Sequence, residues 1–315
     1  DRETYELLHQ AETDGVFQLE SGGMRKTLRD MQPDSLEDLI ALVSLYRPGP
    51  MDNIPSYIAR KHGKEQPDYM HPMLEGILKE TYGIMIYQEQ VMQIFRELAG
   101  YSYGRADIVR RAMSKKKLDV MEKERTAFIF GCEENGIDKT VANTIFDQMS
   151  EFAKYAFNKS HAACYALVAY RTAYLKCYFP AEFMAALMTS VLDQSNKIAR
   201  YTAECKRLGI RLAPADINTS MQGFTANKKI INYGLLGIKN VGKEFVDDIV
   251  KERKNGEFKD LPDFCMRLQG KHFNRRAVES LIRCGAMDCF DLNRRQMLQA
   301  LPSIAANIEN YRQRT

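Results

Sequence analysis

The sequence predicts a mainly α-helical protein in which a long multi-helix part precedes a small β-hairpin element and a tandem helix-hairpin-helix region. Three observations predict this class. Apolar residues recur at helical spacing up to about residue 208. Residues 224–234, FTANKKIINYG, alternate around a polar turn, as a short hairpin does. Beyond residue 234, glycine-containing turns precede amphipathic segments. This change of pattern predicts a boundary near residue 220, with domains over residues 1–220 and 221–315.

Helix start and stop signals are clear in the first domain. Ser35 is a suitable cap for a helix that begins at Leu36 and ends before the Arg-Pro-Gly-Pro loop at residues 47–50. Asn135-Gly136 predicts a left-handed helix stop, and Pro180 predicts a helix start. The periodicity predicts further helices over residues 82–100, 138–153, 160–179, 181–192 and 196–208.

Positive charge is gathered in two places. Residues 104–117, GRADIVRRAMSKKK, hold six cations and one Asp, and residues 225–315 hold 17 basic and 11 acidic side chains, whereas the whole chain has a net charge of only +4. We expect the first stretch to form a helix with Ile108, Val109, Ala112 and Met113 on its apolar side. A solvated helix face and an anion-binding surface both fit this charge, and two separate anionic contacts are the natural expectation.

The second basic region contains a candidate phosphate-binding turn. Residues 239–242, Lys-Asn-Val-Gly, precede a helix predicted from Lys243. Such a turn exposes backbone N–H groups at a helix N-terminus, where the helix dipole favours an anion. Asn240 stands where a Gly-x-Gly hairpin has its first glycine, and Asn tolerates the left-handed conformation. An ordinary turn remains the alternative. A second unit, residues 274–288, has only Gly285 at its turn and matches less well.

Composition limits the class of protein. Seven cysteines include no C-x-x-C pair and form an odd total, which argues against a disulfide framework or a zinc site and favours a reducing, cytoplasmic compartment. No apolar run approaches the roughly 20 residues of a membrane span. The first residue is Asp1 and not Met, so we expect the chain to be a piece of a longer protein.

Eight stretches, in order, resemble the alpha (catalytic) subunit of bacterial DNA polymerase III, a C-family replicative polymerase. The resemblance covers residues 11 to about 300 and implies the fingers domain, over residues 1–220, followed by the tandem helix-hairpin-helix region, over residues 221–315. The stretches are GVFQLES (15–21), RPGPM (47–51), RKHGKE (60–65), YGIMIYQEQVMQI (82–94), RRAMSKKK (110–117), FNKSHAACYALVAYRTAYLK (157–176), FPAEFMAALM (179–188) and GIKNVG (237–242).

The resemblance implies roles for particular residues. The paired arginines would bind the triphosphate of an incoming dNTP, since guanidinium groups bind phosphate oxygens in a bidentate way. Ser160 is also a candidate helix cap, and His161 is expected to make a polar contact and not to act as a general base. The dNTP triphosphate set is Arg110, Arg111, Lys115 and Lys116; the set near the nucleotide and primer-template is Arg47, Asn158, Lys159, Ser160 and His161; the duplex DNA phosphate set is Lys239, Asn240, Gly242, Lys243, Arg275 and Arg276.

Catalysis is not expected from this chain alone. Nucleotidyl transfer by the two-metal route requires a carboxylate cluster, and the sequence shows none; Asp247-Asp248 lies on the helix predicted after the hairpin and is a poor substitute. We therefore expect no catalytic residue, metal site or bound cofactor here, with Mg²⁺ in the palm of the complete DNA-directed DNA polymerase. The implied partners are DNA primer-template, incoming dNTP, the rest of the subunit, and the sliding clamp and other holoenzyme subunits through regions outside this chain, with no membrane.

Two other classes stay open from the residues. A standalone helix-hairpin-helix repair or recombination factor would bind duplex DNA in a salt-sensitive way and would be indifferent to nucleotide. A helical protein-interaction scaffold would bind neither ligand.

Overall fold

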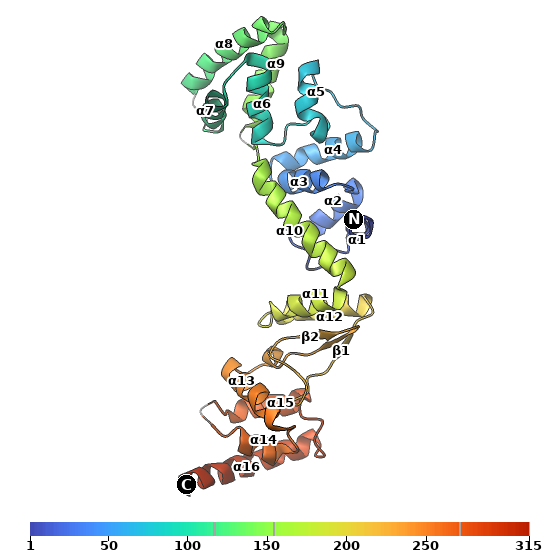
Figure 1. The fold of residues 1–315 in the computed structure, drawn as a ribbon, viewed down its shortest axis with the longest axis vertical. Helices are drawn as coiled ribbons and strands as arrows, with labels where there is room; N and C mark the ends of the chain where they lie inside the picture. The colour runs from blue at the N-terminus through green and yellow to red at the C-terminus, as the bar shows by residue number, and fades with distance from the viewer. Residues whose placement is uncertain (116–117, 154, 271, 315) are drawn as a thin grey trace. The chain divides into compact units, whose positions relative to one another are not determined.

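The protein is mainly α-helical with one small sheet, which confirms the predicted fold class (Figure 1). The structure is a computed structural model, and it describes residues 1–115, 118–153, 155–270 and 272–314. It divides into two compact units, Asp1–Tyr174 and Leu175–Thr315. The boundary at residue 220 concerns the roles of the two parts and stays a prediction. In the part of the chain that the structure describes, no helix is both long enough and apolar enough to cross a bilayer.

One core of the first unit joins the N-terminal helices to a long later helix. Small side chains at residues 162, 166, 169 and 173 of the later helix, all alanines and all buried, pack against leucines such as Leu28 and Leu42. Alanines at this spacing form one smooth face, which lets the helices approach closely. The helices are α1 (Arg2–His9), α2 (Gly22–Met31), α3 (Leu36–Leu45), α4 (Ile54–Lys61) and α10 (Lys159–Tyr178).

The start of α3 is fixed by a buried carboxylate. The Ser35 hydroxyl caps the helix by accepting from the Asp38 amide at 3.2 Å, as the sequence predicts. Asp38 accepts from Lys61 Nζ at 2.8 Å and from the Tyr57 hydroxyl at 3.1 Å. Burial alone would raise the pKa of Asp38, but the hydrogen bond and charge of Lys61, with hydrogen bonds from the Asp34 amide and the Ser35 hydroxyl, outweigh it and lower the pKa. The ion pair therefore ties α4 to the first turn of α3.

A second core of the first unit is built around Phe95. Its ring lies 5.2 Å from those of Tyr101 and Phe128 and 6.2 Å from that of Phe146, so three neighbouring helices and the loop after Gly100 meet there. Gly100 ends its helix in the left-handed conformation, as predicted. The helices of this core are α5 (Pro72–Leu78), α6 (Gln88–Ala99), α7 (Tyr103–Ser114), α8 (Leu118–Glu134) and α9 (Lys139–Phe152).

Two details differ from the sequence prediction. The helix expected from Tyr82 begins only at Gln88, because Tyr82 and Gly83 have positive φ values of 52° and 80° and Tyr87 pairs as a β-bridge with Phe157. Ile108 does not lie on the buried side of α7. The buried residues of α7 are Ala106, Val109, Ala112 and Met113, and Ile108 is 65% exposed, because at about 100° per residue it turns away from this face.

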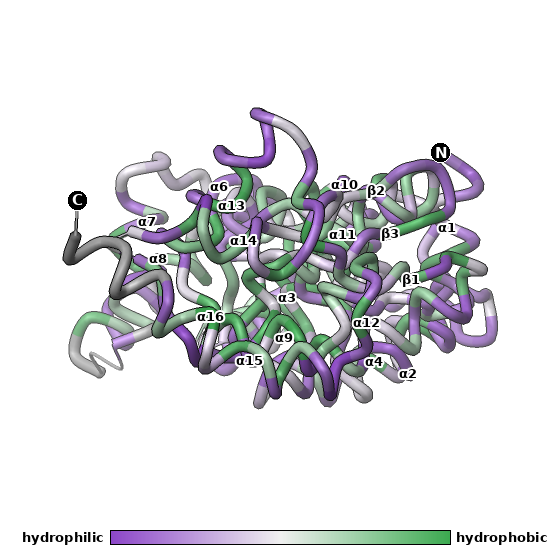
Figure 2. Tube along the Cα trace, turned by 90° about the horizontal axis from the view of Figure 1, so that it is seen from below, coloured by the Kyte–Doolittle hydropathy of each residue, from purple (hydrophilic) through white to green (hydrophobic). Residues whose placement is uncertain are grey.

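The second unit has a mixed layer and a helical part. Helices α11 (Pro180–Thr189) and α12 (Ser195–Arg207) pack on a three-stranded sheet of order β1-β3-β2. Strands β2 (Thr225–Asn227) and β3 (Ile230–Asn232) form the predicted hairpin, and β1 (Arg211–Ala213) adds in parallel to β3. The helical part holds α13 (Lys243–Glu252), α14 (Leu261–Arg267), α15 (Arg275–Cys284) and α16 (Arg294–Arg314) around a separate core. In Figure 2, hydrophobic and hydrophilic stretches interleave along the tube, as expected for a chain whose helices have one buried face.

A buried ion pair fastens the C-terminal end of α10 to α12 within the second unit. Lys176 Nζ donates to Glu204 Oε1 at 2.6 Å, and its side chain is fully buried. Arg207 donates to both Glu204 oxygens, at 2.8 and 2.9 Å. Burial alone would raise the pKa of Glu204, but the hydrogen bonds from Arg207 and Lys176 outweigh it and lower the pKa to about 2.

The Glu204 ion pair should make stability depend on pH at the acid end. The pKa is about 2 in the folded chain against 4.5 ordinarily, so the stabilisation is present above about pH 4.5 and is lost as the pH falls towards 2. We expect Glu204→Gln to lower the free energy of unfolding by about 3 kcal/mol above that range and by much less near pH 2. Urea unfolding followed by circular dichroism across this range measures the difference, and a difference independent of pH contradicts the assignment.

Candidate functional site

The first candidate surface is the basic helix α7, where one carboxylate holds both adjacent arginines. Asp107 Oδ1 accepts from Arg110 Nη2 at 2.7 Å and from Nε at 3.2 Å, and Asp107 Oδ2 lies 2.7 Å from Arg111 Nη2. The hydrogen bond from Arg110, with help from the Arg111 charge, lowers the pKa of Asp107. A single carboxylate that spans two guanidinium groups occupies donors that would otherwise suit a phosphate.

The two arginines differ in how firmly they are held. The Arg110 side chain is 15% exposed and donates from Nη1 to Gln88 Oε1 at 3.1 Å, whereas the Arg111 side chain is 66% exposed. Lys115 follows α7 as its exposed C-cap. Lys116, predicted to join this set, lies outside the described residues. Arg111 and Lys115 are therefore open to an anion, and Arg110 is part of the protein's own bonding.

Gln88 links the arginine pair to a distant segment of the same unit. Its side-chain Nε2 donates to the carbonyl of Ala156 at 3.0 Å, and its backbone N–H donates to the carbonyl of Phe157 at 2.8 Å. The Phe157 N–H donates in turn to the carbonyl of Ile86 at 3.1 Å. We call this pairing of residues 86–88 with residues 155–157 the crossing. It brings the start of α6 against the start of α10.

Arg47 is bound to the same crossing from the other side. Its Nε donates to the Ser44 carbonyl at 2.8 Å, its Nη2 donates to the Tyr155 carbonyl, and its guanidinium lies 4.4 Å from the centre of the Phe157 ring. Burial lowers the pKa of Arg47. Gly49 in the same loop has φ 97°, and a Cβ there would meet the Tyr155 ring at 2.7 Å, so the loop requires glycine. Arg47 thus positions residues 155–157.

Glu89 organises the start of α10. Its carboxylate accepts from Asn158 Nδ2 and from the Lys159 amide, both at 3.0 Å. The Lys159 ammonium lies 2.7 Å from Glu80 Oε2 and 5.3 Å from the centre of the Tyr87 ring. The Lys159 charge is therefore balanced by a protein carboxylate in the same way as the charge of the arginine pair.

The helix cap of α10 is Asn158, and the alternative of Ser160 as cap is wrong. Asn158 Oδ1 accepts from the His161 amide at 2.8 Å, and α10 already begins at Lys159. Ser160 lies inside the first turn and is exposed. The His161 ring lies 4.4 Å from the Tyr165 ring and 5.5 Å from the Phe157 ring, tilted to the first and edge-on to the second. Among the described residues no carboxylate bonds to it. Such a carboxylate is what would orient a general base.

A nearby cavity of about 590 Å³ is unsuited to phosphate. Its lining includes the carboxylates Asp52, Asp68 and Glu151 and a single arginine, Arg60. The Arg60 side chain already donates to Glu65 and to the Tyr82 carbonyl. A triphosphate in this cavity would meet like charge, so α7 is the better anion surface of this unit.

The second candidate surface is the hairpin before α13. Asn240 has φ 67°, so it takes the left-handed position that glycine occupies in a Gly-x-Gly hairpin, and Gly242 has φ −81° as the N-cap of α13. Ile238 and Val241 are buried on either side of it and anchor the turn. Asn240 Nδ2 donates to Ser280 Oγ of α15 at 3.1 Å. No side-chain hydrogen bond caps α13, so the turn leaves the first N–H groups of this helix without a side-chain acceptor. Lys239 and Lys243 flank the turn in sequence, and Glu244 places one negative charge in the first turn of the helix.

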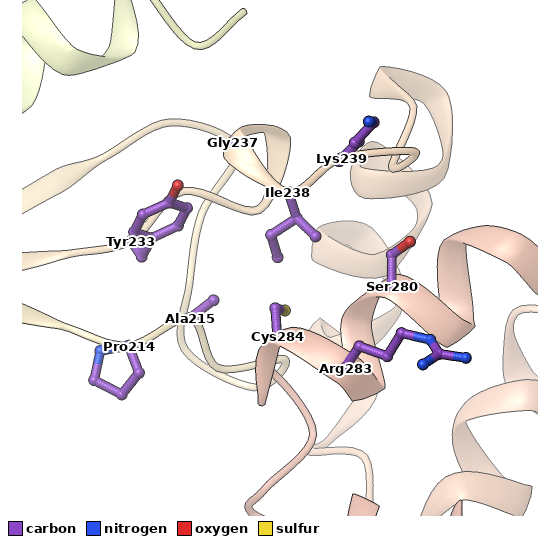
Figure 3. Close-up of a pocket in the computed structure, with 9 residues that line it drawn as sticks. All are labelled: Pro214, Ala215, Tyr233, Gly237, Ile238, Lys239, Ser280, Arg283 and Cys284. Atoms are coloured by element: carbon purple, nitrogen blue, oxygen red, sulfur yellow. The ribbon is translucent and has the colours of Figure 1, made fainter. Parts of the chain in front are cut away.

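The hairpin, α15 and the segments around Ala215 and Tyr233 line an open cavity of about 500 Å³. Figure 3 shows an apolar side formed by Ile238, Ala215 and Tyr233, with the tips of Lys239 and Arg283 directed away from it. Arg283 is a cation that sequence reasoning missed, since nothing in the local pattern marks it.

The second helix-hairpin-helix segment predicted from the sequence, residues 274–288, is less regular. Asn274 caps α15 by accepting from the Arg276 amide at 2.9 Å, and Arg275 pairs with Glu279 at 3.2 Å. Both arginines are exposed in the first turn. Gly285, at φ 88°, is the C-cap of α15, so the predicted turn follows this helix and leads towards α16.

Carboxylates are dispersed among these elements. Asp248 pairs with His272 at 2.9 Å, and Asp247 accepts from Gln222 at 3.2 Å. Within residues 1–115, 118–153, 155–270 and 272–314, no three His, Cys, Asp or Glu side chains gather as metal ligands would.

Sequence reasoning missed one residue of the first surface. Asp107 entered the prediction only as a subtraction from the charge, yet its position three and four residues before the two arginines is the spacing at which helical side chains pair. Gln88 and Glu89 bond across to residues 156–159, and these contacts lie between segments too far apart in the chain for a local pattern to show them.

Comparison with known proteins matches both parts of the chain. Residues 1–136 match the finger domain of the bacterial DNA polymerase III alpha subunit, and residues 209–297 match a helix-hairpin-helix motif. DNA polymerase III subunit alpha of Chlamydia trachomatis is 50% identical over 93% of the chain, that of Thermus aquaticus 49% over 96%, and that of Bacillus subtilis 45% over 96%. The chain covers 24%, 25% and 27% of these three relatives, about a quarter of their length.

The Asn158 cap can be tested against Ser160. We expect Asn158→Ala to destabilise the start of α10 by about 1 kcal/mol, because the His161 amide loses its acceptor and Glu89 loses a donor. Ser160→Ala is the matched control and should change the free energy of unfolding by less than about 0.5 kcal/mol. Hydrogen exchange of the His161 amide measures both effects, and faster exchange in the Ser160 variant than in the Asn158 variant would reverse the assignment.

Proposed function

Because the chain belongs to the family of bacterial DNA polymerase III alpha subunits, of which it spans about a quarter, we propose that it binds an incoming dNTP and the primer-template duplex. In this proposal the first unit holds the triphosphate, and the helix-hairpin-helix part of the second unit grips duplex DNA. The complete polypeptide is a DNA-directed DNA polymerase, a nucleotidyltransferase of DNA replication in the cytoplasm. Its metal chemistry, with Mg²⁺, takes place in a palm domain outside this chain.

The observation that carries the proposal is the carboxylate shared by Arg110 and Arg111. Asp107 already arranges two guanidinium groups around oxygens at 2.7 Å, and triphosphate oxygens can be bound by guanidinium groups in the same charge-assisted way. Since Arg111 is the more exposed of the pair, it can exchange Asp107 for phosphate at little cost. We assign Arg111 and Lys115 to direct contact, and Arg110 to contact combined with its bond to Gln88. Lys116 remains a candidate for the same set.

The crossing and the bonds around it hold residues 155–161 in place. Arg47 donates to the Tyr155 carbonyl. Asn158 donates to Glu89, and Lys159 pairs with Glu80. The exposed edge of this segment, with Ser160 and the stacked His161 ring, is the part we assign to the primer-template junction. Closure of such a site on a matched nucleotide would orient the triphosphate for chemistry done by the palm.

Duplex DNA is assigned to the second unit because its hairpin offers backbone N–H groups with cations beside them. The groups are the amides of Gly242 and Lys243 with the side chains of Lys239, Arg275 and Arg276, and Asn240 contributes through the conformation of the turn. Contacts of this kind are made to phosphates and do not distinguish one base from another. Binding would therefore be independent of DNA sequence and strongly dependent on salt.

Arg111 provides the central test of the proposal. In the complete alpha subunit we expect Arg111→Ala to raise the KM for dNTP by about 10- to 100-fold, because an exposed phosphate contact is lost, and to leave the Kd for primer-template within about twofold. Arg105→Ala is the matched control: Arg105 lies on the same helix, is 46% exposed and is already paired with Glu124.

Steady-state kinetics and a duplex titration across a salt series separate the alternatives. Equal loss of nucleotide and duplex binding in the Arg111 variant would favour one extended DNA surface and sink the nucleotide assignment. Unchanged nucleotide kinetics in both variants would mean that α7 does not contact the nucleotide, and would sink the assignment of Arg111.

The hairpin conformation gives a second test. We expect Asn240→Gly to keep duplex affinity within about twofold, because glycine adopts φ 67° without strain, and Asn240→Ala to weaken it several-fold, because a Cβ residue without a polar side chain disfavours this conformation by about 1 kcal/mol or more. Fluorescence anisotropy with labelled duplex measures both. Equal affinities in the two variants would mean that the turn does not set the duplex contact.

A further inference from the structure

The exposed face of α7 carries an apolar residue among its cations. Gly104, Ile108, Arg111 and Lys115 follow one another at intervals of four, three and four residues, so they form one straight row on the helix. All four are exposed, and Ile108, at 65%, is the most exposed of the large apolar side chains in the part of the chain that the structure describes.

The Ile108 side chain takes no part in the packing of the core. The buried face of α7 is complete without it, since Val109 and Met113 are fully buried on the opposite side. A β-branched residue at an exposed helical position also costs a few tenths of a kcal/mol relative to Lys or Arg. The space beside it is open, because a Cβ added at Gly104 would meet nothing within 4 Å.

We propose that Ile108 packs against the nucleoside part of the nucleotide whose phosphates Arg111 and Lys115 bind; this inference rests on the function proposed above. At 1.5 Å per residue, Ile108 lies roughly 4.5 Å along the helix from Arg111, and Arg111 lies roughly 6 Å from Lys115. The row therefore offers cations at one end and apolar surface at the other, in the order in which a nucleotide presents phosphates, sugar and base. Gly104 adds no side chain at the apolar end of the row, so this residue does not obstruct the nucleoside.

The neighbours of Ile108 favour a nucleotide over other occupants. A duplex backbone presents hydrated phosphates, which are met by cations and polar groups and gain nothing from an isoleucine. The core of a protein interface is depleted of charge. Ile108, in contrast, directly follows Asp107 in the chain, and Asp107 pairs with both Arg110 and Arg111. Ligand sites for small molecules combine apolar surface with a few placed charges, which is the composition of this row.

The test uses the complete alpha subunit with Ile108→Ala and Ile108→Leu. We expect the alanine variant to raise the KM for dNTP by about tenfold with kcat changed by less than about twofold, since it removes apolar contact made to bound nucleotide, and we expect leucine to restore most of the loss. Phe130→Ala is the matched control, because Phe130 lies on neighbouring α8 and is 61% exposed. It should leave both constants unchanged.

Two results would overturn the inference. An unchanged KM with weaker primer-template binding would make Ile108 part of a DNA surface. An unchanged KM with a lower unfolding midpoint would make it a contact with the rest of the polypeptide. Arg111→Ala separates this failure from failure of the proposed function: if Arg111→Ala raises the KM and Ile108→Ala does not, only the inference about Ile108 fails, whereas if neither raises it, the nucleotide site itself fails.

Discussion

The backbone pairing of residues 86–88 with residues 155–157 is the constraint on which the first unit depends. Three hydrogen bonds there join segments about seventy residues apart, so they fix where α6 and α10 begin. The groups around the candidate site take their positions from it: Arg47 binds the Tyr155 carbonyl, Glu89 binds the start of α10, and Arg110 reaches the crossing through Gln88. Loss of the crossing would release all three at once, which is why a local change there has an effect wider than its own hydrogen bonds.

Several cations of the first unit are paired with protein carboxylates that a phosphate could replace. Asp107 balances the two arginines, and Glu80 balances Lys159, so the cations are held in defined positions without a ligand. Pairing with a protein carboxylate limits the entropy that a long side chain loses when a phosphate arrives, but the phosphate must also displace that carboxylate. Arg111 is more exposed than Arg110 and has no bond to Gln88, so it gives up fewer protein contacts when a phosphate binds. This is the physical reason that the two arginines receive different roles.

The second unit solves a different problem with backbone geometry. Its hairpin must turn tightly enough to present N–H groups at the start of α13, and a residue with positive φ makes that turn possible. Asn240 provides it and gains a hydrogen bond to Ser280 that glycine could not make. Buried Ile238 and Val241 hold the turn against the core, so the hairpin is rigid on one side and open on the other. Rigid backbone donors lose little entropy on binding an anion, which suits contacts that do not depend on base sequence.

The sequence by itself determined the features that arise within a few residues of each other. The cap at Ser35, the stop at Gly100, the β2–β3 hairpin and the turn before Lys243 all follow from signals within one or two helical turns. Only the tertiary structure decided the rest, because contacts between distant segments compete with local preference. A left-handed turn at Tyr82 and Gly83 and the crossing keep residues 82–87 out of a helix despite their apolar pattern. Glu89 helps to make Asn158 and not Ser160 the cap. Likewise, a run of apolar residues on α7 predicts burial for Ile108, but burial depends on where the neighbouring helices α6 and α8 pack, and they leave Ile108 in solvent.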